Sequence, residues 1–133
     1  MPGKYKVSPP EDRRAMGRTF GSRAEMRYAL YLEKAYDDGF VLDYICQPRI
    51  WLGVPENVYV PDFFVVPECS QEYPGSILPH YIDVKGMRTA KFNRDAKLFK
   101  EYGRSKLIIV KETSAHKFKM VEIITPKLYT GDL

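Results

Sequence analysis

The chain has 133 residues, of which 44% are hydrophobic and 14% aromatic, enough apolar material to build the core of one domain. Its net charge of +4 favours anionic partners without identifying them. No apolar run approaches the roughly 18 residues that span a bilayer, and residues 1–14 lack the apolar stretch of a secretory signal. We therefore expect a soluble, cytoplasmic protein that does not enter a membrane.

The chain begins with a basic leader followed by a helix. Residues 1–20 contain Pro and Gly, show no apolar periodicity and carry several basic side chains, which predicts a mobile basic arm. A single domain is then expected over residues 21–133. Ser22, an amphipathic run and then Gly39 are the start and stop signals of a helix over 23–37.

The rest of the chain predicts five strands and a second helix. Runs rich in β-branched and aromatic residues predict strands over 44–53, 58–66, 80–85, 106–111 and 118–125. The first two are expected to form an antiparallel hairpin with a turn at 54–57, and 67–79 should be a loop because it contains three prolines. A helix at about 92–102 would cross over to the fourth strand. This α-β-β-β-α-β-β order predicts an α/β fold with a mixed central sheet flanked by helices.

Two acids and one lysine stand at the ends of two of these strands. Asp62 follows Pro61 in a run that is apolar on both faces, which implies a central, buried position. Asp83 and Lys85 are two residues apart, so one strand presents an acid and an amine on the same face. An Asp62–Lys85 ion pair would leave Asp83 unexplained. Two converging carboxylates repel unless one is protonated or a cation lies between them, so a Mg²⁺ site is the more economical interpretation.

Glu25 is a possible third carboxylate of this site. It fits a capping box with Ser22, in which its side chain would bond back to the Ser22 amide. On a helical wheel it also falls within the apolar arc of the helix. We therefore expect its carboxylate to face the sheet in addition to any capping role.

A strongly basic segment directly follows these acids. From Lys85 to Lys106 there are eight basic and two acidic side chains, a net charge of +6 that leaves −2 for the remainder. The predicted second helix separates an apolar arc from a basic one. A solvated lysine face is the ordinary explanation, but so unbalanced a run beside the acids favours phosphate contacts. The residues expected to contact DNA, here and in the leader, are Arg14, Arg18, Arg88, Lys91, Arg94, Lys97 and Lys100.

Four other residues carry weaker signals. Gln47 could support the acidic pocket, although a surface glutamine before a bulge explains it equally well. Trp51 could stack on unpaired bases, with core packing as the default. Cys46 and Cys69 lack metal-ligand spacing and are expected to be separate reduced thiols.

Glu25, Pro61-Asp62 and Asp83-Val84-Lys85 together resemble the signature of the PD-(D/E)XK nuclease superfamily. Over residues 20–111 the pattern is most similar to phage endonuclease I-type Holliday junction resolvases, although Asp83 stands where many members have Glu. The resemblance implies a restriction-endonuclease-like core in which Asp62, Asp83 and the Val84 carbonyl hold Mg²⁺. Glu25 would complete or water-bridge the site, Lys85 would orient or deprotonate the attacking water, and Mn²⁺ is expected to substitute for Mg²⁺.

The resemblance predicts a metal-dependent endonuclease that hydrolyses phosphodiesters in branched DNA, without an organic cofactor. A homodimer is expected because a symmetric four-way junction requires two cuts. The chain shows no recognisable specificity domain, which argues against a sequence-specific restriction enzyme. Two alternatives stay open: a nicking or end-processing subunit of a phage or transposon DNA-processing complex, and a catalytically silent nucleic-acid-binding module.

Overall fold

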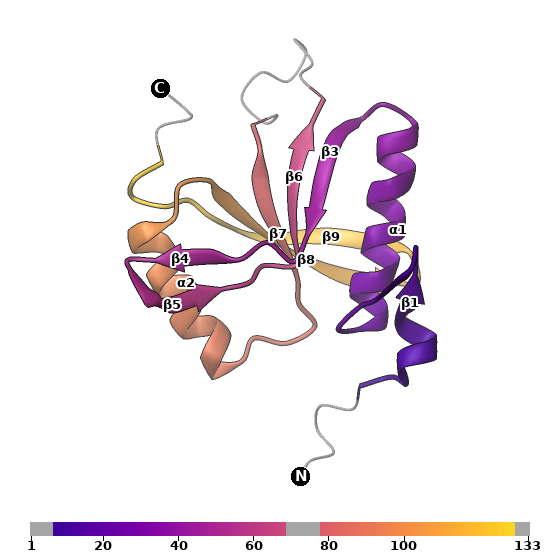
Figure 1. Cartoon of the computed structure of the whole chain (residues 1–133), viewed down its shortest axis with the longest axis horizontal. Coiled ribbons are helices and arrows are strands. Elements are labelled where there is room, and N and C mark those ends of the chain that lie inside the picture. Colours follow the sequence, from indigo (N-terminus) through magenta and orange to yellow (C-terminus); the bar gives the residue numbers. More distant parts are fainter. Residues whose placement is uncertain (1–6, 69–77, 130–133) are drawn as a thin grey trace.

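The computed structural model describes residues 7–68 and 78–129, whose centre is a five-stranded mixed sheet in the order β3-β6-β7-β8-β9 (Figure 1). Neighbouring strands are antiparallel except β7 and β8, which are parallel and are connected through helix α2. The mixed sheet and the helical crossover predicted from the sequence are therefore confirmed. The elements are β3 (Val41–Cys46), β6 (Phe63–Pro67), β7 (His80–Val84), α2 (Ala90–Tyr102), β8 (Lys106–Ser114) and β9 (Lys117–Ile124).

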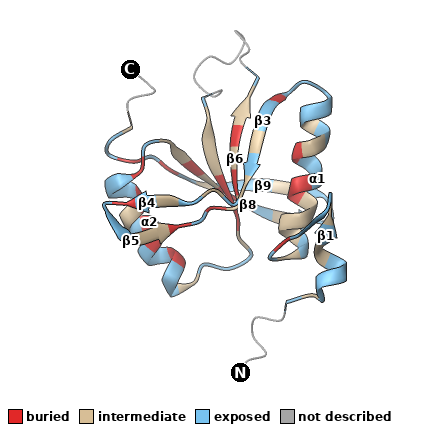
Figure 2. Cartoon of the chain, in the orientation of Figure 1, coloured by how far each residue is buried: buried red, intermediate tan, exposed pale blue. Residues whose placement is uncertain are grey.

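The two α-helices cover opposite faces of this sheet, and Figure 2 shows buried residues on the helices and on the strands between them. Helix α1 (Arg23–Asp37) buries Tyr28, Ala29 and Leu32 in a cluster that includes Ile82 and Val84 of β7. The cluster on the other face contains Phe92, Ala96 and Phe99 of α2 with Leu107, Ile109 and Ile124 of the sheet. Because strand side chains alternate, β7 directs Ile82 and Val84 toward α1, and Tyr81 and Asp83 toward the α2 side.

The predicted helices agree closely with the structure. Helix α1 begins after Ser22, whose Oγ accepts a hydrogen bond of 3.1 Å from the Glu25 amide, and its bounds match the prediction. Helix α2 begins earlier than predicted because Thr89 is its N-cap, with Oγ1 accepting from the Phe92 amide at 3.1 Å. Neither helix in the described part of the chain is long and apolar enough to cross a membrane.

The first two predicted strands were wrong as single elements. Residues 44–53 divide between β3 and β4 (Ile50–Leu52), and residues 58–66 divide between β5 (Val54–Tyr59) and β6. Strands β4 and β5 form a separate antiparallel hairpin outside the central sheet. The predicted turn at 54–57 is also wrong, because the chain turns at Gly53, whose φ of +88° favours glycine.

The β4–β5 hairpin lies over α2. Leu52 and Tyr59 are buried in the same cluster as Phe99, and Gly53 lies against the Tyr102 ring. A Cβ added at Gly53 would stand 2.9 Å from the nearest ring carbon of Tyr102. The hairpin is therefore held on α2 by the buried side chains of Leu52 and Tyr59 and by the Tyr102 ring, which lies against the turn.

The N-terminal segment, expected as a mobile arm, has regular structure where it is described. It contains the 3-10 helix η2 (Pro10–Arg13) and the paired strands β1 (Arg14–Ala15) and β2 (Arg18–Thr19). Phe20, which follows β2, is 1% exposed and belongs to the α1-side core. Residues 1–6, most of the predicted loop at 67–79 and Cys69 lie outside the described residues, whereas Cys46 is a free thiol.

Candidate metal centre and nucleic-acid interface

The two aspartates of the proposed site meet where β6 begins and β7 ends. Phe63 of β6 is paired with Ile82 of β7, so the next residues along each strand, Asp62 and Asp83, face each other. The Asp62 amide donates to Oδ1 of Asp83 at 2.9 Å, and the Val84 amide donates to Oδ2 of Asp62 at 2.7 Å. Each carboxylate is therefore fixed by the backbone of the neighbouring strand.

A third donor reaches Asp83 from the hairpin. The Tyr59 hydroxyl donates to Oδ2 of Asp83, and the two residues are 4% and 1% exposed. Sequence reasoning missed Tyr59 because its position in an apolar run suggested core packing alone. The signal that could have found it is the need of a buried carboxylate for donors, together with a tyrosine three residues before Asp62.

Lys85 lies beside this pair. Its Nζ is 3.8 Å from Oδ2 of Asp83 and 4.7 Å from the centroid of the Phe92 ring on α2. The structure thus pairs Lys85 with Asp83. This agrees with the prediction that the two side chains lie on the same face. The contact with Phe92 holds the amine over the start of α2.

Glu25 approaches from the first turn of α1. Its carboxylate accepts a hydrogen bond from the Gly21 amide and lies close enough to Lys85 and Asp83 for their charges to affect its pKa. The charge of Glu25 in turn raises the pKa of Asp62. Within residues 7–68 and 78–129, no group of three or more Asp, Glu, His or Cys side chains is arranged to hold a metal ion. The structure therefore brings Asp62 and Asp83 into direct contact and leaves Glu25 as their electrostatic neighbour.

All three acids have a raised pKa, with burial as the largest cause. Burial raises the pKa of Asp62 well above its ordinary value, and the charges of Asp83 and Glu25 raise it further, against the Val84 amide and Lys85. Burial also raises the pKa of Asp83, whereas Lys85 and the Tyr59 hydroxyl lower it. The pKa of Glu25 is raised mainly by burial. A cation at this place would favour the charged form of all three.

The donor chemistry at the site fits a hard divalent cation. Mg²⁺ is usually bound through one or two carboxylates and keeps several waters. Asp62 and Asp83 provide two carboxylates, and an oxygen that accepts one hydrogen bond still has a second lone pair. The pair could therefore bind such an ion directly, with Glu25 acting through water.

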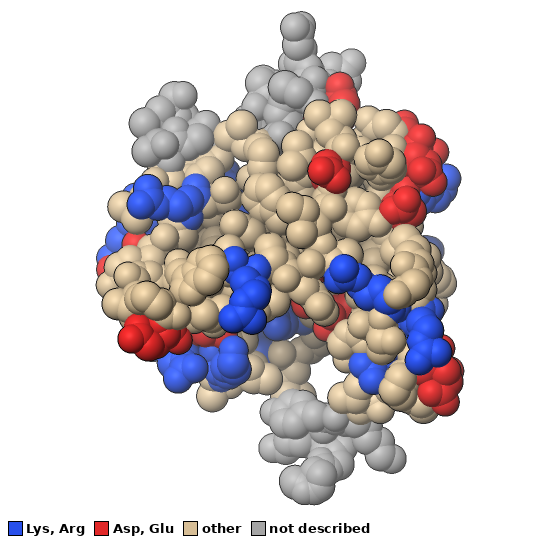
Figure 3. All heavy atoms as spheres, viewed as in Figure 1, with Lys and Arg blue, Asp and Glu red and all other residues tan. Residues whose placement is uncertain are grey.

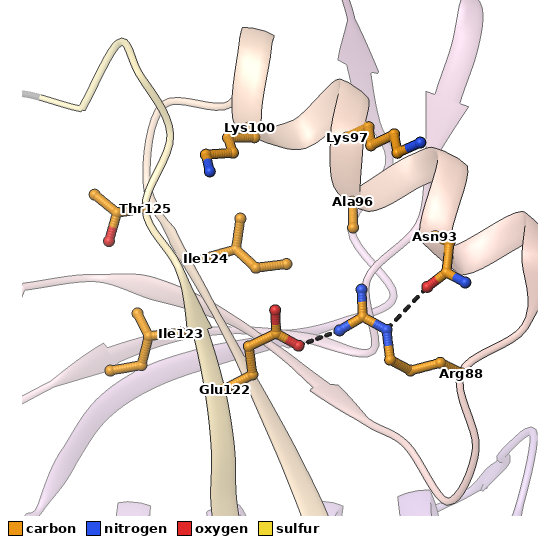
Figure 4. A pocket seen from close by; sticks show the side chains of 9 residues that line it. All are labelled: Arg88, Asn93, Ala96, Lys97, Lys100, Glu122, Ile123, Ile124 and Thr125. Carbon is orange, nitrogen blue, oxygen red and sulfur yellow. Dashed lines mark hydrogen bonds and ion pairs between the residues drawn. The ribbon is translucent and has the colours of Figure 1, made fainter.

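A basic groove of about 590 Å³ lies between α2 and β9 (Figure 4). At the end of the groove next to Phe92, Arg88 donates a hydrogen bond from Nε to Oδ1 of Asn93 at 2.9 Å and forms an ion pair with Glu122. The guanidinium of Arg88 is 5.0 Å from the Phe92 centroid, so one ring contacts both Lys85 and Arg88. Phe92 therefore links the acidic pair to the groove, which is lined by Arg88, Asn93, Ala96, Lys97, Lys100, Glu122, Ile123, Ile124 and Thr125.

The other predicted DNA-contacting residues lie in two regions. On α2, Arg94, Lys97 and Lys100 are exposed, whereas Lys91 pairs with the buried Asp95 at 2.9 Å. Arg14 and Arg18 are exposed on the β1–β2 hairpin beside α1. In the view of Figure 3, basic side chains flank the middle of the face, and acidic atoms are visible between them.

Gln47 meets the site through its backbone. Gln47 lies between β3 and β4 with a φ of +53° and is exposed. Its amide donates to the Asp62 carbonyl at 2.8 Å. Gln47 thus supports the position of Asp62 by a main-chain bond, in place of the side-chain contact expected from the sequence.

Comparisons with protein-family models, curated proteins and solved structures find no match. The fold and the site define the class of the protein as a mixed α/β domain in which a buried aspartate, Asp83, and a partly buried one, Asp62, lie beside a lysine. A basic groove lies next to that pair.

Proposed function

We propose that the chain is a Mg²⁺-dependent endonuclease of the PD-(D/E)XK type, with a restriction-endonuclease-like core, that cuts branched DNA. The observation that carries this proposal is the contact between Asp62 and Asp83, with Lys85 Nζ 3.8 Å from Oδ2 of Asp83. Desolvation and the charge of Asp83 raise the pKa of Asp62, and burial raises the pKa of Asp83, so keeping both acids ionised costs free energy. Such a cost is expected where a functional ion offsets it.

The residues have distinct roles in this proposal. When bound, the divalent ion supplies positive charge at the scissile phosphate and lowers the pKa of water. Asp62 and Asp83, with the Val84 carbonyl, would hold it, and Glu25 would hold a water beside it. Lys85 would orient the attacking water as an ammonium donor, or, after losing its own proton, would take up the proton of that water as a neutral amine. The Phe92 ring and Asp83 direct the amine to the same end of β7.

The proposed substrate is DNA because basic groups continue away from the acids. From Phe92 the groove leads past Arg88 to Lys97 and Lys100, whose exposed amines form no ion pair with another described residue. A DNA strand cut at the aspartates would place neighbouring phosphates along α2. Two such sites in a homodimer would cut a four-way junction in both strands, and the enzyme would act in the cytoplasm.

The test is cleavage of a synthetic four-way junction by the purified protein with and without Mg²⁺. Asp83→Asn should abolish cleavage while junction binding persists, because the ion would lose a charged ligand. Asp43→Asn, an exposed aspartate of β3, is the matched control and should cleave like the wild type. Full activity of Asp83→Asn would refute the site, and equal cutting of linear duplex would refute branch selectivity.

One observation favours the alternative of a silent binding module. Asp83 already has Lys85 as an ion-pair partner and Tyr59 as a donor, so its charge is offset within the protein. In that case the basic groove would bind nucleic acid and the aspartates would only support the fold. Calorimetric titration with Mn²⁺ separates the two: binding that disappears in Asp62→Ala supports the nuclease, and its absence in the wild type supports the module.

A further inference from the structure

Trp51 is a large aromatic residue that the core does not use. It lies in β4 between Ile50 and Leu52, which both face the α2-side core, so its side chain points the other way. Trp51 is 61% exposed, whereas Leu52 is 1% exposed. Its indole therefore presents an open surface on the outer side of the hairpin.

The strand that carries this surface is connected to the acidic pair through the hairpin. Trp51 is paired with Val58 of β5, and the next residue of β5 is Tyr59, which binds Asp83. Val58 also lines a hollow of about 160 Å³ together with Lys85 and Lys91. The exposed indole is thus one cross-strand neighbour away from a hollow that contains the lysine of the proposed site.

The hairpin holds Trp51 in a defined place. Leu52 is buried and Gly53 is in close contact with the Tyr102 ring, so the strand that carries the indole is fixed on α2 at the adjacent residues. An aromatic side chain on such a support loses little further conformational freedom when a ligand stacks on it.

We infer that Trp51 is a stacking site for an unpaired nucleobase of the DNA whose phosphate lies at Asp62 and Asp83. The inference deepens the proposed function and rests on it. Aromatic side chains bind single-stranded nucleic acid by stacking on exposed base faces, while basic groups hold the backbone. In the hollow, Lys85 and Lys91 provide the basic groups, each now paired with an aspartate that a phosphate would compete with. Paired bases inside a duplex offer no free face, so the site selects DNA with unpaired bases at a branch, a gap or a single-stranded overhang.

The chain offers a direct probe, because Trp51 is its only tryptophan. In buffer with EDTA, which prevents cleavage, a short single-stranded oligonucleotide should quench the tryptophan emission, and the blunt duplex of the same sequence should bind without quenching. Binding is measured independently by anisotropy of a labelled oligonucleotide. Unchanged emission when the single strand is fully bound, or no binding of it at all, would overturn the inference.

Variants separate stacking from folding. Trp51→Ala should weaken single-strand binding about tenfold and duplex binding little, and Trp51→Phe should recover most of the loss. The matched control is Phe40→Ala, because Phe40 is 70% exposed at the turn between α1 and β3, away from the hairpin in Figure 1. Equal single-strand affinity of Trp51→Ala and the wild type would overturn the inference, provided that circular dichroism shows both folded.

The failure of this inference can be told from the failure of the proposed function. With Mg²⁺ and a four-way junction, Trp51→Ala should raise KM more than it lowers kcat. If the wild-type protein cleaves nothing, the nuclease proposal fails whatever the emission shows. If it cleaves but the single strand leaves the emission unchanged, only the stacking site fails.

Discussion

The hydroxyl of Tyr59 and the carboxylate of Asp83 join the β4–β5 hairpin to the central sheet at the proposed metal centre. Tyr59 lies at the end of β5, and Asp83 receives its other bond from the Asp62 amide at 2.9 Å. Tyr59 is thus the residue through which the position of the hairpin controls the position of the acid.

Tyr59→Phe is expected to destabilise the fold and to reduce activity. Loss of a donor to a buried carboxylate costs about 1–3 kcal/mol in the free energy of unfolding, measured by urea denaturation. Loss of the group that orients a metal ligand should lower the cleavage rate about 10- to 100-fold. Tyr81→Phe is the matched control, because the hydroxyl of Tyr81, in the strand that carries Asp83, has no hydrogen bond to another described residue. Equal losses in both variants would contradict the role of Tyr59.

The aspartate pair predicts a characteristic dependence of stability on pH without metal. Burial and neighbouring acids raise the folded-state pKa of Asp62, so the folded protein retains a proton that the unfolded chain has released. The free energy of unfolding should therefore fall as pH rises from about 4, the ordinary pKa of Asp, through the raised pKa. Denaturation over a pH series measures this slope.

Asp62→Asn isolates the contribution of Asp62 to that slope. The variant cannot ionise at this position, so its stability should decline less with rising pH than that of the wild type. Added Mg²⁺ should also reduce the decline in the wild type, because a cation favours the charged pair. Identical slopes for the two proteins would show that Asp62 ionises as freely in the fold as in the unfolded chain.

The lysines of the groove should contribute to DNA affinity mainly through charge. Lys97→Gln and Lys100→Gln are each expected to weaken junction binding and to reduce the slope of log K against log salt concentration by about 1. Lys34→Gln is the control, because Lys34 is exposed on α1 and pairs with Asp38 at 3.1 Å. Anisotropy titrations at several salt concentrations measure the effect, and unchanged slopes in the groove variants would place the DNA elsewhere.

Gly53 is required at the hairpin turn for two separate reasons. Its φ is +88°, and an added Cβ would lie 2.9 Å from the Tyr102 ring. Gly39 has a similar φ of +85° but no atom within 4 Å of an added Cβ. Gly39→Ala should therefore show the backbone strain alone, on the order of 1 kcal/mol, and Gly53→Ala should lose more. Thermal denaturation compares the two, and equal losses would show that Tyr102 moves aside freely.

The sequence by itself determined the features that depend on local periodicity. The spacing of apolar residues predicted α1 within its observed bounds and the separation of exposed lysines from buried Phe92, Ala96 and Phe99 on α2. The alternation of strand side chains placed Asp83 and Lys85 together, and the structure pairs them. These features follow from nearest-neighbour geometry, which the order of residues specifies directly.

Only the tertiary structure decided how the strands are shared between sheets and which donors surround the acids. Pro48 suggested an irregularity in the first run, and Pro61-Asp62 interrupts the second. An irregularity within one strand and a break between two strands look alike in a sequence, so the divisions between β3 and β4 and between β5 and β6 were not predicted. The breaks place Tyr59 on a hairpin over α2 and Asp62 at the start of β6, opposite Asp83. Contacts between residues more than twenty positions apart depend on how α2 and the hairpin pack, and this packing completes the proposed site.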